Sequence, residues 1–290
     1  MSPFEPLTPL LSNLSQRKNR RIGIGIQAPT DAMIEGFRLA QAFCMPVLYG
    51  AALPEFESFA SSTPEERLMS DLGKGNVDAA IRGQIHAKPF RAQLSRLYGQ
   101  SFKPSEQMIA VLEFPGGRPM IICPGSNIIA GHMAERAGFI EASACFCGQM
   151  GLPVKIGLLA QCRPDEVPDE SSAASPAQED IRRIIACHRE TEMLVEQYGN
   201  RFAIKNYGID FEKAYEDNVT ILIEPNGTVG NQVIRTLYFL NAAKFYGAPL
   251  MNATHVVLES FRNSRELADV MLLAAAMANA RTDPREVSYP

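Results

Sequence analysis

The stretch that decides the fold is ILIEPNGTVGNQVIRTLYFL, residues 221–240. It begins as a short apolar strand and ends as an amphipathic helix, with two asparagines and two glycines at the junction. We expect Asn226 and Gly227 to supply the positive φ of a sharp turn. The helix should start near Gly230 and Asn231, whose small size would leave the first N–H groups open to an anion.

Arg235 follows Asn231 by four residues, so both should lie on one face of this helix. Two interpretations of the stretch are open. In one, the helix N-terminus and Arg235 bind an anionic ligand. In the other, the junction is a tight turn, and a buried Arg235 pairs with a neighbouring carboxylate.

The alternation of strand and helix continues along the whole chain. Strands are predicted at 21–28, 45–50, 77–83, 108–114, 118–125, 153–160, 219–225 and 255–260, and helices at 30–43, 63–75, 88–99, 127–151, 181–199, 229–247 and 264–280. Thr30 is the expected cap of its helix. This alternation is typical of an α/β fold with mainly parallel sheets.

Two segments depart from the pattern. Residues 1–20 are interpreted as an N-terminal arm or first helix before the core begins, and their basic cluster follows the apolar part, the reverse of a signal peptide. Residues 163–180 are rich in proline, serine and acid, which is typical of a flexible loop.

Composition excludes several classes of function. A net charge of −4 argues against broad nucleic-acid binding, and no apolar run approaches the roughly 18 residues of a membrane span. A cytoplasmic location is therefore expected. The six cysteines lack zinc-site spacing and are interpreted as small buried hydrophobes; a metal or redox pair at Cys145 and Cys147 is the alternative. No metal is predicted.

Polar residues follow the ends of several predicted strands. They are Arg82, Gly83, Ser126, Arg163, Ser260 and Arg262. In an open parallel sheet such loops meet on one side, and several arginines there would bind a polyanion such as a phosphate ester or a coenzyme tail. His86 follows one of these strand ends, and either His86 or Ser260 could handle a proton near neutral pH.

Residues 221–252 and 255–280 resemble the C-terminal half of the phosphate acetyl/butyryltransferase superfamily, which has the isopropylmalate dehydrogenase-like fold. KGNVDAAIRGQIHAKPFRAQL, residues 74–94, is similar to the family's segment in which a strand ends in a substrate loop. The branch called methanogenesis marker protein 4, or MtxX, described as methyltransferase-associated, is the most similar, through LLAQCR and the NG-x-x-GN-x-x-x-RT junction.

The resemblance implies two Rossmann-like subdomains around an interdomain cleft, one of residues 21–128 plus 253–290 and one of residues 129–252. In phosphotransacetylases this cleft holds coenzyme A and acyl phosphate, with arginines on the phosphate. A Ser-Arg-Gly motif and a later aspartate assist thiol deprotonation. Relatives often dimerise through the second subdomain, so a homodimer is expected.

The chain departs from the family pattern at two places. The Ser-Arg-Gly position reads Ser260-Phe261-Arg262-Asn263, and Asp269 matches the acid only with a shift of one residue. AQCRPDE stands where the family has a glycine- and serine-rich phosphate loop. The resemblance therefore supports the family's fold and its anion-binding arginine in this chain better than it supports activation of a thiol.

Three hypotheses follow. The first is a transferase for acyl or one-carbon groups that binds a phosphorylated ligand or coenzyme such as coenzyme A. The MtxX likeness implies a role in tetrahydromethanopterin-type one-carbon metabolism. Its anion would be held by Arg82, Arg163, Arg235 and Arg262, with Asn226, Gly227, Gly230 and Asn231 at the helix N-terminus.

The second hypothesis is a non-catalytic binding or assembly subunit that keeps the fold and docks a partner protein at the 163–180 loop. The third is an NAD-dependent decarboxylating dehydrogenase on the related fold. It is disfavoured because such enzymes hold a divalent metal with a cluster of aspartates, whereas Asp210, Asp217 and Asp269 are isolated in the sequence and are interpreted as surface or cap residues.

Overall fold

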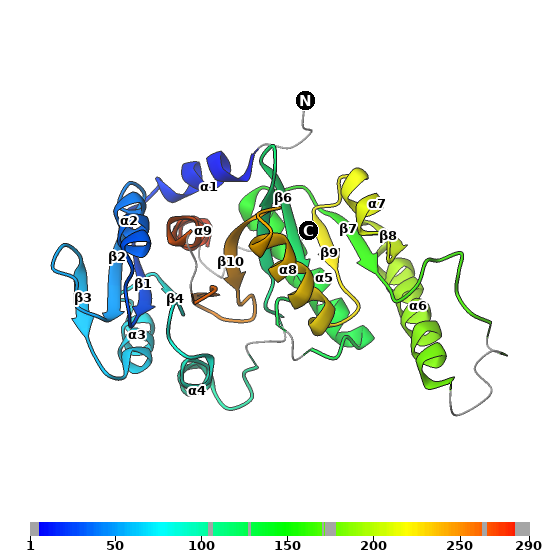
Figure 1. Ribbon diagram of the computed structural model, residues 1–290, viewed down its shortest axis with the longest axis horizontal. Helices are drawn as coiled ribbons and strands as arrows, with labels where there is room; N and C mark the ends of the chain where they lie inside the picture. Colours follow the sequence, from blue (N-terminus) through cyan, green and yellow to red (C-terminus); the bar gives the residue numbers. More distant parts are fainter. Residues whose placement is uncertain are drawn as a thin grey trace. The chain divides into compact units, whose positions relative to one another are not determined.

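A computed structural model describes residues 6–103, 107–126, 129–169, 171, 178–262 and 266–281. The chain forms two compact units, which are drawn in Figure 1. Unit 1 comprises residues 1–104, 110–119 and 241–290, and unit 2 comprises residues 105–109 and 120–240. The expected subdomain boundaries were 128/129 and 252/253.

The sheet of unit 1 is parallel over five strands and then reverses. Its strands are β1 (Arg20–Ile26), β2 (Cys44–Gly50), β3 (Glu57–Ala60), β4 (Ala79–Ile81), β5 (Ala110–Phe114), β10 (Lys244–Pro249) and β11 (Val256–Glu259). Their order is β3-β2-β1-β4-β11-β10-β5. Strands β3 to β11 in this order are parallel, and β10 is antiparallel to both of its neighbours.

The core of unit 1 is built around its last helix. The helices are α1 (Leu7–Ser15), α2 (Asp31–Ala40), α3 (Pro64–Gly73), α4 (Ala87–Tyr98) and α9 (Leu267–Ala280). Helix α9 is buried along almost its whole length and packs on the sheet and on α1 and α2. The side chains of Leu7 and Leu11 are fully buried, so α1 is part of this core. Thr30 caps α2 as expected, accepting from the Met33 N–H at 3.3 Å.

Unit 2 contains a four-stranded parallel sheet. Its strands are β6 (Arg118–Cys123, which begins in unit 1), β7 (Lys155–Leu159), β8 (Ala203–Gly208) and β9 (Ile221–Ile223), in the order β6-β9-β7-β8. Its helices are α5 (Met133–Met150), α6 (Glu179–Tyr198), α7 (Phe211–Glu216) and α8 (Gly227–Phe239). Helix α5 contacts β9, and α6 contacts β8 (Figure 1). The α/β class and the mainly parallel pairing are confirmed.

Several predicted elements differ from those observed. The helix predicted at 229–247 ends at Phe239, because the chain turns at Asn241 with φ 57° and continues as β10. The helix predicted from residue 127 begins only at Met133. Strands β3 and β8 and helix α7 were missed; β8 is an edge strand whose first residues are largely exposed, so it lacks an apolar run.

The flexible loop predicted at 163–180 is described only in part. Residues 170 and 172–177 lie outside the described residues, and Glu179 and Asp180 already form the first turn of α6. Both acids stand at the N-terminus of the helix, where negative charge is favourable.

The junction between β9 and α8 is made by close packing and not by a turn with positive φ. Asn226 has an extended φ of −162°, and Gly227 is the first residue of α8, so the expected left-handed turn is wrong. A Cβ on Gly227 would overlap the carbonyl oxygen of Ser126, and one on Gly230 would lie 2.5 Å from that of Pro124. The loop after β6 therefore passes directly over the first turn of α8.

We expect Gly227→Ala and Gly230→Ala each to lower the free energy of unfolding by roughly 1–3 kcal/mol, because the added methyl meets backbone that cannot move aside. Urea denaturation of the purified variants measures this change.

Gly148→Ala is the matched control. Gly148 lies on the exposed face of α5 with no atom within 4 Å of an added Cβ, so alanine should stabilise by about 0.5–1 kcal/mol through helix propensity. A Gly227→Ala protein as stable as the Gly148→Ala protein would contradict the close packing.

Candidate functional site

Nine of the predicted site residues form two groups, one in each unit. Each group lies where parallel strands end. In unit 1 the group consists of Arg82, Gly83, Ser260 and Arg262, and in unit 2 of Ser126, Asn226, Gly227, Gly230 and Asn231.

In unit 1, β4 and β11 lie side by side and end together, which brings Arg82 to Glu259 and Ser260. Arg82 is 8% exposed, and its Nε donates to Glu259 Oε2 at 3.2 Å. Its Nη1 and Nη2 donate to the carbonyl oxygens of Ile85 at 2.9 Å and Ser260 at 2.8 Å. The guanidinium is therefore held rigidly by its own unit, and only part of its donor set is left for a ligand.

Glu259 is shared between two arginines. Arg91 of α4 donates to Glu259 Oε1 at 3.0 Å, on the other side of the carboxylate from Arg82. Burial lowers the pKa of Arg82, Glu259 raises it, and the positive charge of Arg262 lowers it further. We call Arg82, Arg91 and Arg262 with Glu259 the arginine cluster; three cations around one carboxylate leave it with an excess of positive charge.

The hydroxyl of Ser260 is buried beside this cluster. Ser260 is 4% exposed, and its Oγ has no hydrogen-bond partner among the described residues. Because a buried hydroxyl without a partner costs stability, this group is a candidate for contact with a ligand. Gly83, with φ 56°, turns the chain tightly past the Gly25 carbonyl, and His86 is an exposed residue just before α4.

Arg163 and Arg235 lie in unit 2, outside the arginine cluster. Arg163 follows β7 and donates to Asp210 at 2.9 Å and to Glu166 at 3.2 Å. Arg235 is exposed on α8, where its guanidinium lies 5.3 Å from the ring centre of Phe239. The expectation that Arg235 is buried is wrong, because α8 turns this face to solvent.

The N–H groups at the start of α8 are largely occupied by the chain itself. The N–H of Gly227 donates to Ile129 O at 2.9 Å, and that of Val229 to Asn226 Oδ1 at 3.0 Å. Asn231 Nδ2 donates to Gly125 O at 3.3 Å. The expectation of an open helix N-terminus is thus wrong for these donors.

Ser126 lies in the loop that crosses α8. It is 3% exposed, and its Oγ has no hydrogen-bond partner in the described part of the chain. It is the second buried hydroxyl at a strand end whose partner is not supplied by its own unit.

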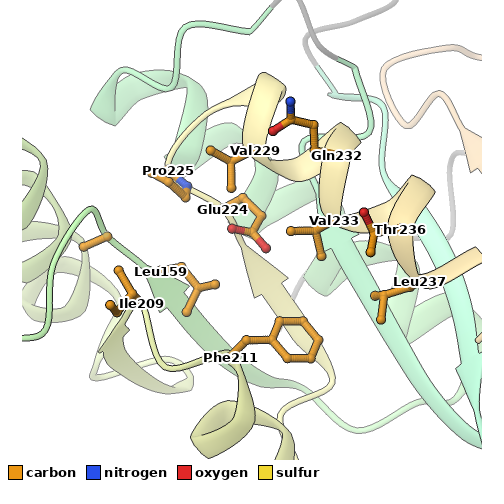
Figure 2. A pocket seen from close by; sticks show the side chains of 11 residues that line it. Leu159, Ile209, Phe211, Glu224, Pro225, Val229, Gln232, Val233, Thr236 and Leu237 are labelled. Atoms are coloured by element: carbon orange, nitrogen blue, oxygen red, sulfur yellow. The ribbon is translucent and has the colours of Figure 1, made fainter. Parts of the chain in front are cut away.

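A candidate site residue that the sequence did not suggest is Glu224, directly after β9. Its side chain is 1% exposed, its Oε1 has no partner among the described residues, and it lines a pocket of about 490 Å³ in unit 2 (Figure 2). Burial raises its pKa to about 7, against the opposing effect of Arg136. An acid at the end of an apolar strand, as in ILIEP, was the available signal.

The pocket around Glu224 has mainly apolar walls from three parts of unit 2. Leu159 and Ala160 come from the end of β7, Ile209 and Phe211 from the chain after β8, and the remainder from α8 and the residues before it. We call it the Glu224 pocket. An acid in such surroundings can act as a proton donor or as an anion near neutral pH.

The described residues contain no group of three or more histidines, cysteines and acids arranged to hold a metal. The six cysteines are free thiols, four of them buried, with Cys145 and Cys187 partly exposed. Burial raises the pKa of Cys123 and Cys44 to about 12, which is typical of unreactive thiols. In the described part, none of the helices has the length and apolar character of a membrane span.

No protein-family model matches this sequence. The chain is 24% identical over 282 residues to the protein named "Putative methyltransferase mtx subunit X" of Methanosarcina barkeri, covering 94% of this chain and 99% of the relative. The protein of the same name from Methanosarcina mazei is 23% identical, with 94% and 96% covered.

Two solved structures share the fold. EutD phosphotransacetylase from Staphylococcus aureus matches with a TM-score of 0.65 at 12% identity, covering 94% of this chain and 98% of that one. A branched-chain phosphotransacylase from Enterococcus faecalis V583 also gives 0.65, at 14% identity, with 90% and 99% covered. The expected likeness to the MtxX branch agrees with these sequence relatives, and the two solved structures confirm the fold that the resemblance implied.

In the unmodified protein, we expect the free energy of unfolding to fall as the pH rises through the pKa of Glu224. The Glu224→Gln variant should not show this decrease. The folded-state pKa of about 7 lies above the ordinary 4.5, so the folded state binds the proton more tightly. The contribution of Glu224 is therefore complete below pH 4.5 and falls between pH 4.5 and about 7, by up to about 3 kcal/mol.

Urea unfolding at about pH 5 and about pH 8 checks this expectation, since glutamine has the same shape and no charge. Glu212→Gln, on the exposed face of α7, is the control and should behave as the unmodified protein. Equal pH dependence in the unmodified and Glu224→Gln proteins would refute the assignment.

Proposed function

We propose that this chain is a phosphotransacetylase-like transferase that binds a phosphorylated ligand or coenzyme and transfers an acyl or one-carbon group. One observation carries the proposal: the arginine cluster at the ends of β4 and β11, with its excess positive charge, lies beside the buried and unpartnered hydroxyl of Ser260. Charge-assisted contacts from arginine to phosphate are among the stronger polar interactions in proteins.

Arg82 and Arg262 have different roles in this proposal. Arg82 is fixed by Glu259 and two carbonyl oxygens, so it supplies a preorganised positive charge. Arg262 is exposed and close enough to lower the pKa of Arg82, so it is the residue proposed to contact the phosphate directly. The Ser260 hydroxyl donates to a phosphate oxygen or passes a proton.

In acyl transfer to a thiol such as that of coenzyme A, the thiol loses its proton and its sulfur bonds to the acyl carbon. The bond from that carbon to the phosphate oxygen breaks, and phosphate leaves. Stabilising the leaving phosphate is the task proposed for the arginine cluster, and accepting the thiol proton is proposed for Ser260 or His86. The word methyltransferase in the names of the sequence relatives supports a methyl group as the alternative cargo, and tetrahydromethanopterin-type one-carbon metabolism stays a prediction.

A non-catalytic binding or assembly subunit is the second candidate. The ring of Phe261, which stands in the Ser-Arg-Gly position, packs at 4.6 Å from the ring of Phe245. Asp269, the shifted match to the family's acid, pairs with Lys244 Nζ at 3.4 Å. Both features favour binding without thiol activation. A homodimer, a partner at the 163–180 loop and a cytoplasmic location stay predictions.

We expect Arg262→Gln to weaken binding of coenzyme A or acetyl phosphate roughly ten- to a hundredfold, the value of one hydrogen bond to a charged group. Isothermal titration calorimetry measures the change. Arg96→Gln is the matched control, since Arg96 is an exposed arginine of α4 paired with Glu66. Equal effects of the two substitutions would contradict a phosphate site at the arginine cluster.

Ser260→Ala separates the two candidate functions. If the chain is a transferase in which Ser260 passes the proton, this variant should retain its affinity for the phosphorylated ligand within about threefold but lose most of its turnover, because only the proton step is impaired. Formation of the acyl thioester from acetyl phosphate and coenzyme A is the assay. Tight binding with no turnover of any acyl phosphate by the unmodified protein would instead support the binding subunit.

A further inference from the structure

The Glu224 pocket lies apart in sequence from the arginine cluster and has the opposite chemistry. Among the described residues that line it, Glu224 alone is ionisable, and most of the others are aliphatic or aromatic. Figure 2 shows its carboxyl group between Val233 of α8 and the side chains of Leu159 and Phe211. Its volume of about 490 Å³ is in the range of small-molecule sites.

The position of the Glu224 carboxyl group is fixed by the fold. The Glu224 N–H donates to Cys123 O at 2.7 Å, which extends the pairing of β9 with β6 by one residue. Oε1 is nevertheless without a hydrogen-bond partner in the described part of the chain. Leaving a buried carboxyl oxygen unpaired costs stability, which a ligand with N–H donors would restore.

The charges around Glu224 indicate which charge a ligand of the pocket should carry. Arg136 of α5 is fully buried; its two Nη atoms donate to Thr191 Oγ1 and Leu159 O, both at 2.7 Å, and its Nε has no hydrogen-bond partner among the described residues. Glu190 of α6 also acts on Arg136, and the thiol of Cys123 on β6 is neutral because burial raises its pKa. When Glu224 is ionised, the carboxylates of Glu190 and Glu224 both act on the single cation Arg136. These three side chains together then carry one uncompensated negative charge.

We propose that the Glu224 pocket binds a small organic amine, whose ammonium group donates to Glu224 while its aliphatic or aromatic body packs on the walls from β7 and α8. The ammonium neutralises the surplus carboxylate, and its N–H donors supply Oε1 with a partner. This site goes beyond the proposed function, since it takes a cation without phosphate and lies in unit 2.

The experiment uses the full chain and three probes of equal length: hexylamine, hexan-1-ol and hexanoate. Hexylammonium should bind most tightly at about pH 8, and about tenfold more weakly at about pH 6, where most of the Glu224 carboxyl is protonated. Hexan-1-ol should bind more weakly at both pH values without that dependence. Calorimetry or protein-observed NMR gives the affinities.

Two variants test the residues. Glu224→Gln should weaken hexylammonium binding at about pH 8 by about tenfold or more and remove its pH dependence, leaving hexan-1-ol unaffected. Val233→Phe should fill the pocket from α8 and reduce binding of all probes while keeping Glu224. The control variant Glu212→Gln should change neither the affinity for hexylammonium nor its pH dependence.

Three outcomes overturn the proposal. Hexanoate binding more tightly than hexylammonium would mean that a protonated Glu224 donates to the ligand. Equal affinity for hexylammonium and hexan-1-ol would mean that the carboxyl takes no part. Absence of binding by all three probes would mean that something else, such as a second copy of the chain, covers the pocket. Because none of the probes carries phosphate, each outcome is independent of the arginine cluster.

Discussion

The contact between the first turn of α8 and the loop after β6 determines the geometry of unit 2. It brings two backbones together at a distance that only glycine permits, at Gly227 and Gly230. The Gly227 N–H and the Asn231 side chain then bond to carbonyl groups of the crossing segment. Since α8 directly follows β9, this contact also fixes where β9 ends, and so where Glu224 and Ser126 lie.

The same contact explains why the described residues at the start of α8 do not present a set of open N–H donors to an anion. Helix N-termini bind anions when their N–H groups are open. Here the crossing loop and Asn226 accept from them instead. Arg163 is likewise satisfied by Asp210 and Glu166. Among the described residues, the buried groups without a hydrogen-bond partner include the Oγ atoms of Ser126 and Ser260 and Oε1 of Glu224, which lie at strand ends where a ligand could supply the partner.

Long periodic segments were predictable from the sequence because their own residues determine them. The Thr30 cap and the succession from β1 to α4 depend on neighbours within a few positions. Glycine is required at position 227 because the carbonyl of Ser126, about a hundred residues away in the sequence, lies against it. From the sequence alone, only a turn could be predicted there. Glu224 was missed for a related reason: its burial is created by β7, β8 and α8 together. The pairing of Arg82 with Glu259 required the parallel register of β4 and β11.

Position at the end of a parallel strand therefore does not by itself specify a ligand. In unit 1 the ends of β4 and β11 carry three arginines around one carboxylate, and we expect this surplus of positive charge to favour anions. In unit 2 the end of β9 carries a buried acid whose Oε1 has no partner among the described residues, and the neighbouring Arg136 directs both Nη atoms to other groups, so we expect hydrogen-bond donors to be favoured there. Likeness of fold is shared with phosphotransacetylases, but the sign of the uncompensated charge at each strand end belongs to this chain, and it decides which molecules can bind.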